Sequence, residues 1–408
     1  MLKNTIWRIA LVPSVYGVAV WGVLLLALSL QMIEVKVSFE AYVIYCYTVV
    51  CFIFSALVNY QFTRGIVARR VSERIRSDAV DGIALCFFLV LGVYGLLRYI
   101  LDFSRLLEGE NFFLIFIVDP LRLRVLATEG SSIGFQLSYL TWPVISYFIF
   151  WLKEAGCSRP KRIIVIAGLV FLFLANTLFV DRTRPVLLLI TGALTYLVIF
   201  NGGIRKPLRV VMFAILGPIA IFFLQALFTS KYDADEGLFR NFAVYLLGGF
   251  GYFSAALSEQ APLGGLENTL LPAFKVLASL GLTAPPPSEI LDFKGVPFLT
   301  NVGTFLYPLL ADGGWGFVLL MLPVLVFGLD FMALRAFKSN TIFGVFVWAN
   351  LVAASLLSFF VPKYNSTYLW LFLGLYLAII ASKALIRLGS GASCSGSRKV
   401  LAASYNDR

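Results

Sequence analysis

Apolar runs long enough to cross a lipid bilayer recur along the whole chain. A membrane-spanning helix needs about 20 mostly apolar residues, because each residue adds about 1.5 Å and the hydrocarbon layer is about 30 Å thick. Of the 408 residues, 60% are hydrophobic and 13% are charged, whereas about 25% of a soluble domain is charged. The pattern predicts an all-α polytopic membrane protein and excludes an ordinary soluble enzyme, a disordered chain and a coiled coil.

Ten membrane-spanning segments are predicted within a single transmembrane domain, residues 1–388. Residues 389–408 are small and polar and predict a disordered cytoplasmic tail. The apolar run 112–118 is too short to span, and the glycine-interrupted run 242–257 is predicted to be a helix at the outer membrane interface. The predicted spans are residues 9–30, 41–58, 82–101, 134–152, 163–180, 186–201, 210–229, 315–334, 341–361 and 367–386.

The distribution of lysine and arginine orients these segments. With the N-terminus in the cytoplasm, 21 of the 33 Lys and Arg residues fall on the inner side and the other 12 outside. Cytoplasmic loops are rich in these residues, so we expect both termini in the cytoplasm. The net charge of +11 is then a topology signal, and no nucleic-acid partner is expected. Two external loops follow, 102–133 and 230–312, and the larger should contain short helices because structureless loops of that length are rare.

The sequence indicates no cofactor and no metal site. It has no histidine, which excludes imidazole as a base or ligand. It lacks a P-loop, a dinucleotide fingerprint and paired metal-binding carboxylates. The five cysteines fall in predicted spans or on the cytoplasmic side and do not fit a zinc spacing. No structural disulfide is expected.

Seven arginines lie on the predicted outer side. The guanidinium group is a planar fork that binds phosphate through two hydrogen bonds, which lysine cannot reproduce. The set therefore predicts recognition of an anionic lipid headgroup. The alternative is that each arginine pairs with a nearby carboxylate. The seven are Arg98, Arg105, Arg122, Arg124, Arg182, Arg184 and Arg240.

The densest local arrangement is Asp181-Arg182-Thr183-Arg184-Pro185, between two predicted spans. Pro185 suits the first turn of a helix, so the positive end of the helix dipole should point outward there. Arg182 and Arg184 beside free backbone donors predict an anion site at headgroup depth. The alternative is a tight hairpin whose arginines only reach out to the surface.

The end of the larger loop is rich in polar groups. Asn301, Thr304 and Tyr307 offer amide and hydroxyl groups that could line a sugar site, or they are turn residues. Asp312 is predicted to cap the following helix.

An acidic cluster lies at the beginning of the same loop. Asp233, Asp235 and Glu236 are either a solvated charge run or the source of a general base for a sugar hydroxyl. The residues themselves do not identify the base.

The layout of spans, the large late loop, the stretch 301–314 and the Arg-Thr-Arg-Pro hairpin resemble bacterial O-antigen repeat-unit polymerases of the Wzy type. In the larger loop, Arg240 and Gly251 are separated by ten residues, similar to the Arg-x10-Gly motif of such loops. The smaller loop departs from the family pattern, because Arg122 and Arg124 lack a glycine at that spacing. Arg98 does have a glycine at that spacing, Gly109, but Arg98 lies at the end of a predicted helix.

This resemblance implies a metal-independent glycosyltransferase with a GT-C-like fold in the bacterial inner membrane, with its active site facing the periplasm. The growing glycan on undecaprenyl pyrophosphate would be the donor, and a lipid-linked repeat unit the acceptor. A chain-length regulator and a flippase are the implied partners. The implied catalytic residues are Arg240, Asp233, Glu236 and Tyr307. The implied substrate-binding residues are Arg122, Arg124, Arg182, Arg184, Gly251, Asn301 and Thr304.

Three other functions are weighed against this one. An O-antigen ligase is expected to use a periplasmic histidine, which the chain lacks. A lipid-linked oligosaccharide flippase should carry charged residues in mid-span, and these are scarce. A non-catalytic length regulator should have a large soluble domain, and none is predicted.

Overall fold

The protein is an all-α polytopic membrane protein, as predicted. The computed structural model describes residues 8–31, 35–72, 79–107, 109–119, 122–123, 126, 133–154, 158–177, 179, 183–200, 238–259, 265–288, 291–292, 294–296 and 299–403. Within these residues, seven helical segments are long and apolar enough to cross a bilayer. They are α3 (Phe39–Ser72), α4 (Ala79–Leu106), the pair α7 (Ile133–Ser138) and α8 (Thr141–Glu154), α9 (Arg159–Thr177), α10 (Thr183–Phe200), α14 (Tyr307–Lys338) and α16 (Thr367–Ala403).

Shorter elements complete the described fold. The apolar helices α2 (Pro13–Ser29) and α15 (Ile342–Leu356) coincide with predicted spans, and the predicted span 210–229 lies outside the described residues. The others are α5 (Phe112–Val118), α12 (Leu238–Ser258), α13 (Leu271–Ser279), the short helix η1 (Lys363–Asn365) and the antiparallel strands β1 (Lys294–Gly295) and β2 (Leu299–Thr300).

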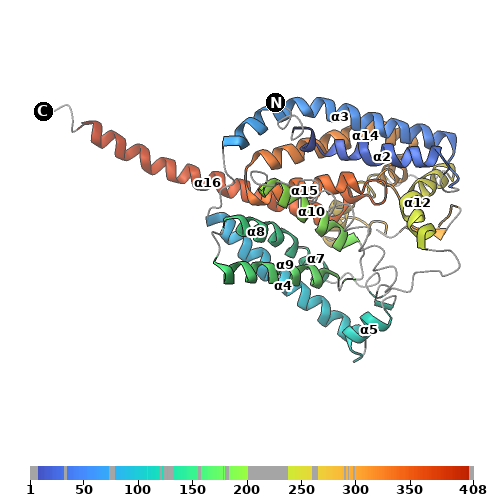
Figure 1. The fold of residues 1–408 in the computed structure, drawn as a ribbon, viewed down its shortest axis with the longest axis horizontal. Coiled ribbons are helices and arrows are strands. Elements are labelled where there is room, and N and C mark those ends of the chain that lie inside the picture. The colour runs from blue at the N-terminus through green and yellow to red at the C-terminus, as the bar shows by residue number, and fades with distance from the viewer. Residues whose placement is uncertain are drawn as a thin grey trace.

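The helices run back and forth between two ends of an elongated bundle (Figure 1). We call one the basic end, where α3, α8 and α14 end and α4, α9 and α15 begin; it carries Lys153, Arg159, Arg335 and Lys338. We call the other the loop end, where α10, α14 and α16 begin and α5 and α12 lie (Figure 1). This alternation agrees with the predicted order of spans.

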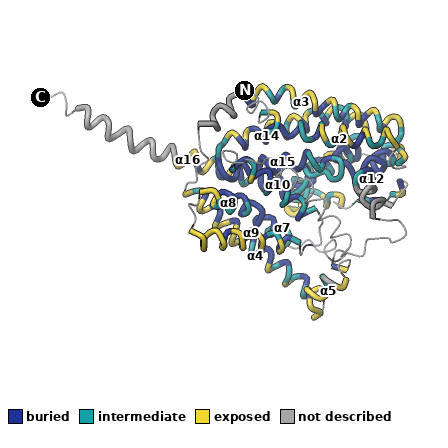
Figure 2. The backbone as a smooth tube through the Cα atoms, in the orientation of Figure 1, coloured by how far each residue is buried: buried dark blue, intermediate teal, exposed yellow. Residues whose placement is uncertain are grey.

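Helix α15 forms the centre of the bundle (Figure 2). Every residue from Ile342 to Ser355 is buried. A helix that is apolar all round suits the interior of a protein or of a membrane, and α15 is enclosed by protein because it packs against α2, α8, α10 and α14. By contrast, α3, α4 and α9 expose many apolar residues on their outer faces, as lipid-facing helices do (Figure 2).

One predicted span, 134–152, is broken into α7 and α8. Pro143 lacks the N–H that would bond to the carbonyl of Tyr139, and its ring crowds that carbonyl, so the helix is interrupted at Tyr139 and Leu140. The broken segment packs closely on α4. A Cβ atom on Gly95 would lie 2.4 Å from the backbone nitrogen of Ser138, so only glycine permits this approach.

Two predicted boundaries differ from the structure. The span predicted at 315–334 begins earlier, because α14 starts at Tyr307 and bends at Gly313–Gly314, where Gly314 has a φ of 68°. The larger loop therefore ends at residue 306 rather than 312. The tail predicted to be disordered from residue 389 is helical as far as Ala403, because α16 continues beyond the bundle (Figure 1).

The run 242–257 is helical as predicted. Helix α12 continues through its glycines and lies at the loop end (Figure 1). Its depth in the membrane stays a prediction. The run 112–118 is the short helix α5, as expected from its length.

Candidate functional site

Asp312 joins the larger loop to the first turns of α14. Its buried carboxylate accepts hydrogen bonds from the backbone nitrogen and the Nδ2 of Asn268, both at 2.9 Å, and from the backbone nitrogen of Thr269 at 2.6 Å. The prediction that Asp312 caps a helix is wrong. The helix begins five residues earlier, at Tyr307, and the amides that reach this carboxylate come from a distant segment instead.

The short helix η1 connects this part of the loop to α10. Asn365 donates from Nδ2 to the carbonyl oxygen of Asn268 at 2.8 Å. Two residues earlier, the Nζ of Lys363 donates to the hydroxyl of Thr183, the first residue of α10, at 3.3 Å. The start of α10 and the middle of the larger loop are therefore parts of one region, although more than 80 residues separate Thr183 from Asn268 in the chain.

Tyr364 lies between these two contacts. Its side chain is buried, and its carbonyl oxygen accepts a hydrogen bond from the Nε1 of Trp370 at 3.0 Å. Burial raises the pKa of Tyr364 well above its ordinary value, and the negative charge of Asp312 raises it further. The phenol therefore stays protonated, and η1 holds a hydroxyl beside a carboxylate.

Arg184 is enclosed by aromatic rings and is 1% exposed. Its guanidinium carbon lies 4.1, 3.8 and 3.9 Å from the ring centroids of Phe135, Tyr139 and Phe179. Nη1 donates to the hydroxyl of Ser138 at 2.8 Å, and Nη2 donates to the carbonyl oxygen of Phe135 at 3.2 Å. No ion pair joins Arg184 to a carboxylate of the described residues. Its charge is stabilised by ring faces and neutral acceptors at the break between α7 and α8.

The glycines of α12 allow close packing of Thr304, Val296 and Phe359 against the helix. A Cβ on Gly249 would lie 2.7 Å from the carbonyl oxygen of Phe359, and a Cβ on Gly251 would lie 2.8 Å from that of Val296. Thr304 is fully buried beside Gly249, and its hydroxyl accepts from the backbone nitrogen of Leu306 at 3.3 Å. The sequence predicts that Thr304 either lines a sugar site or is a turn residue, and its burial and its bond to Leu306 fit a turn residue.

A second polar cluster surrounds Tyr307. Its ring meets that of Tyr252 edge to face, with centroids 5.3 Å apart. Lys294 of the hairpin lies 5.5 Å from the centroid of Tyr252 and forms an ion pair with Glu259. Burial raises the pKa of Tyr252, and Tyr307, Asp292 and Glu259 raise it further. Tyr252 is therefore a hydrogen-bond donor rather than a base.

The structure brings together Gly251, Thr304 and Tyr307 of the predicted set, with Asn301 half-buried just after β2. Arg240 lies in α12, but its side chain is outside the described part of the chain. Arg122 pairs with Glu110 at 2.7 Å, as the carboxylate alternative expected. The same alternative holds for Arg98, which pairs with Asp102 at 2.9 Å. Asp233, Glu236, Arg124 and Arg182 lie outside the described residues.

Sequence reasoning missed Lys363, Tyr364 and Asn365. They occupy the short connection between two predicted spans, where a turn needs no functional explanation. One signal was available, because Lys363 is a basic residue on the predicted outer side. Its contact with Thr183 required the folded chain.

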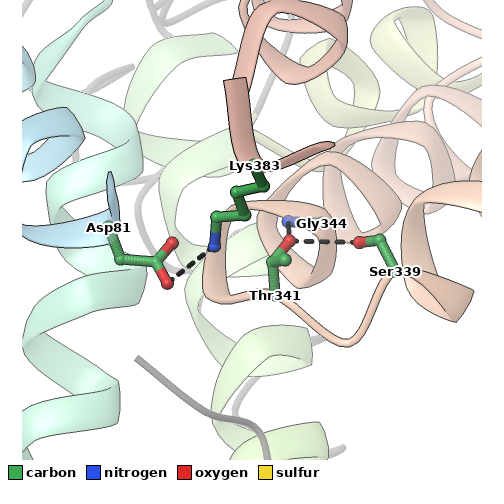
Figure 3. A network of polar contacts seen from close by, with 5 residues as sticks. All are labelled: Asp81, Ser339, Thr341, Gly344 and Lys383. Atoms are coloured by element: carbon green, nitrogen blue, oxygen red, sulfur yellow. Dashed lines mark hydrogen bonds and ion pairs between the residues drawn. The ribbon is translucent and has the colours of Figure 1, made fainter. Parts of the chain in front are cut away.

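The basic end holds a different kind of charged contact (Figure 3). Lys383 of α16 donates to the carboxylate of Asp81 of α4 at 2.8 Å, and both side chains are buried. Beside them, Thr341 caps α15 by accepting a hydrogen bond from the backbone nitrogen of Gly344, and its hydroxyl contacts that of Ser339 (Figure 3). This network joins helices and is far along the bundle from η1.

No metal centre is apparent in the part of the chain that the structure describes, where no group of three or more His, Cys, Asp and Glu residues could hold an ion. Comparison with protein-family models, curated proteins and solved structures finds no match to this chain. Any assignment of function therefore rests on its own residues.

Proposed function

We propose that the protein is a bacterial membrane glycosyltransferase of the repeat-unit polymerase type. It transfers a growing glycan from undecaprenyl pyrophosphate to a lipid-linked repeat unit. The reaction takes place at the loop end, which faces the periplasm in the inner membrane. The predicted topology and the resemblance of the sequence to Wzy-type polymerases support this proposal.

One structural observation carries the proposal. Through Lys363 and Asn365, η1 contacts both the start of α10 and Asn268 in the middle of the larger loop. Asn268 also bonds to Asp312 of α14. The start of α10, η1 and the first turns of α14 thus share one end of the bundle. A glycosyl transfer from a lipid pyrophosphate needs such neighbours, because leaving group and acceptor must be held together.

The chemistry sets what each group must do. The bond between the anomeric carbon and the pyrophosphate oxygen breaks, and a bond from that carbon to the acceptor hydroxyl oxygen forms. The hydroxyl proton passes to a base, and undecaprenyl pyrophosphate leaves with its negative charge. Fixed positive charge near the leaving group lowers the barrier of a transition state of this kind.

The chain offers groups for these roles. Lys363 and Arg182 are proposed to contact the pyrophosphate, while Arg184, enclosed by its rings, contributes charge without direct contact. Tyr252 and Tyr307 are proposed as hydrogen-bond donors to the glycan. Asp233 and Glu236 stay the sequence candidates for the base, and Glu259 and Asp292, whose charges act on Tyr252, are two further carboxylates in this loop.

Reconstitution tests the proposal directly. The full chain in lipid nanodiscs is incubated with an undecaprenyl-pyrophosphate-linked oligosaccharide that serves as donor and acceptor. We expect a ladder of lengthened lipid-linked glycans and release of undecaprenyl pyrophosphate, both measured by mass spectrometry. A properly folded chain that lengthens no glycan from any of a panel of such donors contradicts the proposal.

Substitution of Lys363 locates the site. Loss of one charged hydrogen bond of about 1.5–3 kcal/mol slows turnover by roughly 10–150-fold if that bond forms in the transition state. We expect this of Lys363→Met, whereas Lys275→Met in α13 of the same loop should extend glycans at the wild-type rate. Equal rates for the two variants would remove Lys363 from the site.

The alternative function is a flippase, which should carry charged residues in mid-span. Helix α14 has one buried carboxylate in mid-helix, Asp330, but its role is structural. Asp330 accepts hydrogen bonds from the backbone nitrogen of Ser14 at 2.8 Å and the hydroxyl of Ser55 at 2.6 Å, so it caps α2. The location of lipid-linked glycans in cells that lack the protein distinguishes a polymerase from a flippase. Loss of a polymerase leaves single units on the outer side, whereas loss of a flippase leaves none there.

A further inference from the structure

Helix α13 and the turn after it expose large apolar side chains. Val276 is 59% exposed, Leu280 67% and Leu282 68%. The turn is well defined: Gly281 has a φ of 72°, and the backbone nitrogen of Leu282 donates to the carbonyl oxygen of Leu277 at 2.9 Å. This backbone geometry closes a helix C-terminus and sets the direction of the side chains that follow.

The position of α13 along the bundle is fixed by its N-terminal anchor. Asn268 and Thr269, just before α13, bond to Asp312, which directly precedes the bend of α14. Asn268 also bonds to Asn365, two residues before α16 begins. Helix α13 has 9 residues and is therefore about 13.5 Å long. It lies within that distance of the level where two spanning helices begin.

The neighbour of α13 is itself a membrane-facing helix. Helix α13 packs against α16, which is among the helices apolar enough to span. The outer part of α16 exposes Trp370 and Leu371, and Trp370 has the indole that typically marks a membrane–water interface. The apolar residues of α13 thus lie beside a surface that already faces lipid.

The other exposed part of the same loop has a different chemistry. Around the β1–β2 hairpin, Asp292 and Gly295 are exposed, and Lys294 pairs with Glu259. Charged and small residues suit contact with water. Within its described residues, the loop therefore contains a polar hairpin and an apolar helix, and the exposed surface of the helix is one that water does not favour.

We propose that Val276, Leu280 and Leu282 insert into the outer leaflet of the bilayer, so that α13 is an interfacial helix. Its occupant is lipid acyl chains at the membrane surface, because the anchors at Asp312 and Asn365 hold the helix at that level. The larger loop then has two attachments, a polar one to the protein core and an apolar one to the membrane. This inference does not depend on the proposed enzymatic function.

Site-specific photo-crosslinking tests the contact. The photoreactive amino acid p-benzoylphenylalanine replaces Val276, Leu280 or Leu282, one at a time, in the full chain with its native cysteines. After reconstitution in phosphatidylethanolamine–phosphatidylglycerol vesicles and illumination, we expect lipid adducts by mass spectrometry at all three positions. The control is Gly295, which is exposed and has no atom within 4 Å of a built Cβ, and no lipid adduct is expected there.

Two other outcomes overturn the proposal. Cross-links between two copies of the chain from these positions would show a dimer surface instead. If no lipid adducts form at positions 280 and 282, this side of α13 and its turn is in contact with water rather than lipid.

A second measurement does not rely on the photoreactive group. The double variant Leu280→Asp with Leu282→Asp should lose amide-exchange protection over residues 271–283 in vesicles, while α15 keeps its protection and so reports an intact fold. Gly295→Asp should leave both regions unchanged. Unaltered protection at 271–283 in the double variant would contradict membrane insertion.

Discussion

Two buried cations, Lys383 at the basic end and Arg184 at the loop end, are stabilised in different ways. Lys383 has 7% of its side chain exposed and pairs with Asp81, which has 0% exposed. Arg184 meets three ring faces and two neutral acceptors, and no carboxylate of the described residues pairs with it. The first arrangement cancels the charge locally, whereas in the second the described residues leave the positive charge in place.

This difference separates a structural contact from a candidate functional one. A neutralised pair joins α4 to α16 and projects little field beyond itself. A guanidinium at the start of α10 that pairs with no carboxylate of the described residues adds to the positive end of that helix. Asp312 is the opposite case at the loop end, a buried anion held by three N–H donors.

The largest expected effect is the loss of one partner of the ion pair. Lys383→Met removes the cationic partner of the buried Asp81 carboxylate, and breaking a buried ion pair costs about 3–5 kcal/mol of stability. Thermal unfolding in detergent, followed by fluorescence, measures the loss. The double variant Asp81→Leu with Lys383→Met should recover most of it. No recovery in the double variant would mean that the pair is not the source of the cost.

The next effect concerns the contact between α4 and α7, because Ser138 and Phe135 of α7 bond to Arg184. Gly95→Ala places a Cβ against the backbone of α7 near Ser138, and overpacking of this kind costs about 1–3 kcal/mol. Gly82→Ala in the same helix has open space around its Cβ and should be neutral or slightly stabilising. If the two variants unfold at the same temperature, α4 and α7 are not in close contact.

Arg184→Met tests the contrast itself. It removes a cation–ring interaction of about 2 kcal/mol when desolvated. It also removes a buried charge, and among the described residues it leaves no carboxylate without its ion-pair partner. We expect a loss of stability well below that of Lys383→Met, together with a strong loss of glycan extension. A loss equal to that of Lys383→Met would indicate that Arg184 has an acidic partner.

A smaller and more local effect is expected for Asp312→Asn. The amide keeps the shape but offers one acceptor oxygen where the carboxylate has two, so a buried N–H loses its bond at a cost of about 1–3 kcal/mol. The loss should appear as faster amide exchange at residues 266–271, with little change in α15. Unchanged exchange there would show that these bonds do not hold the loop.

The smallest effect is expected for Ser138→Ala. It deletes one acceptor of Arg184 at a cost of about 1 kcal/mol. The three rings should keep the guanidinium in place, so glycan extension should persist. A complete loss of extension in this variant would indicate that Ser138 has a role beyond positioning Arg184.

The positions of most helices were predictable because the bilayer imposes a length and a composition on every segment that crosses it. The spans that became α3, α4, α9, α10 and α16 follow from apolar runs alone. Three details did not follow from such runs. Pro143 interrupts a span without changing its hydropathy, Gly313–Gly314 bends α14 instead of preceding it, and α16 continues past its apolar part.

In the candidate site, too, some features followed from the sequence and others only from the tertiary structure. The sequence by itself determined the all-α membrane fold, the alternation of helix ends and the clustering of Arg182, Arg184 and the 301–307 stretch on one predicted side, because hydropathy and charge act locally along the chain. Only the tertiary structure decided the partners: Thr183 for Lys363, Asn268 for Asp312 and Asn365, and three rings for Arg184. Contacts between residues tens to hundreds of positions apart depend on how the helices pack, and no local pattern encodes that packing.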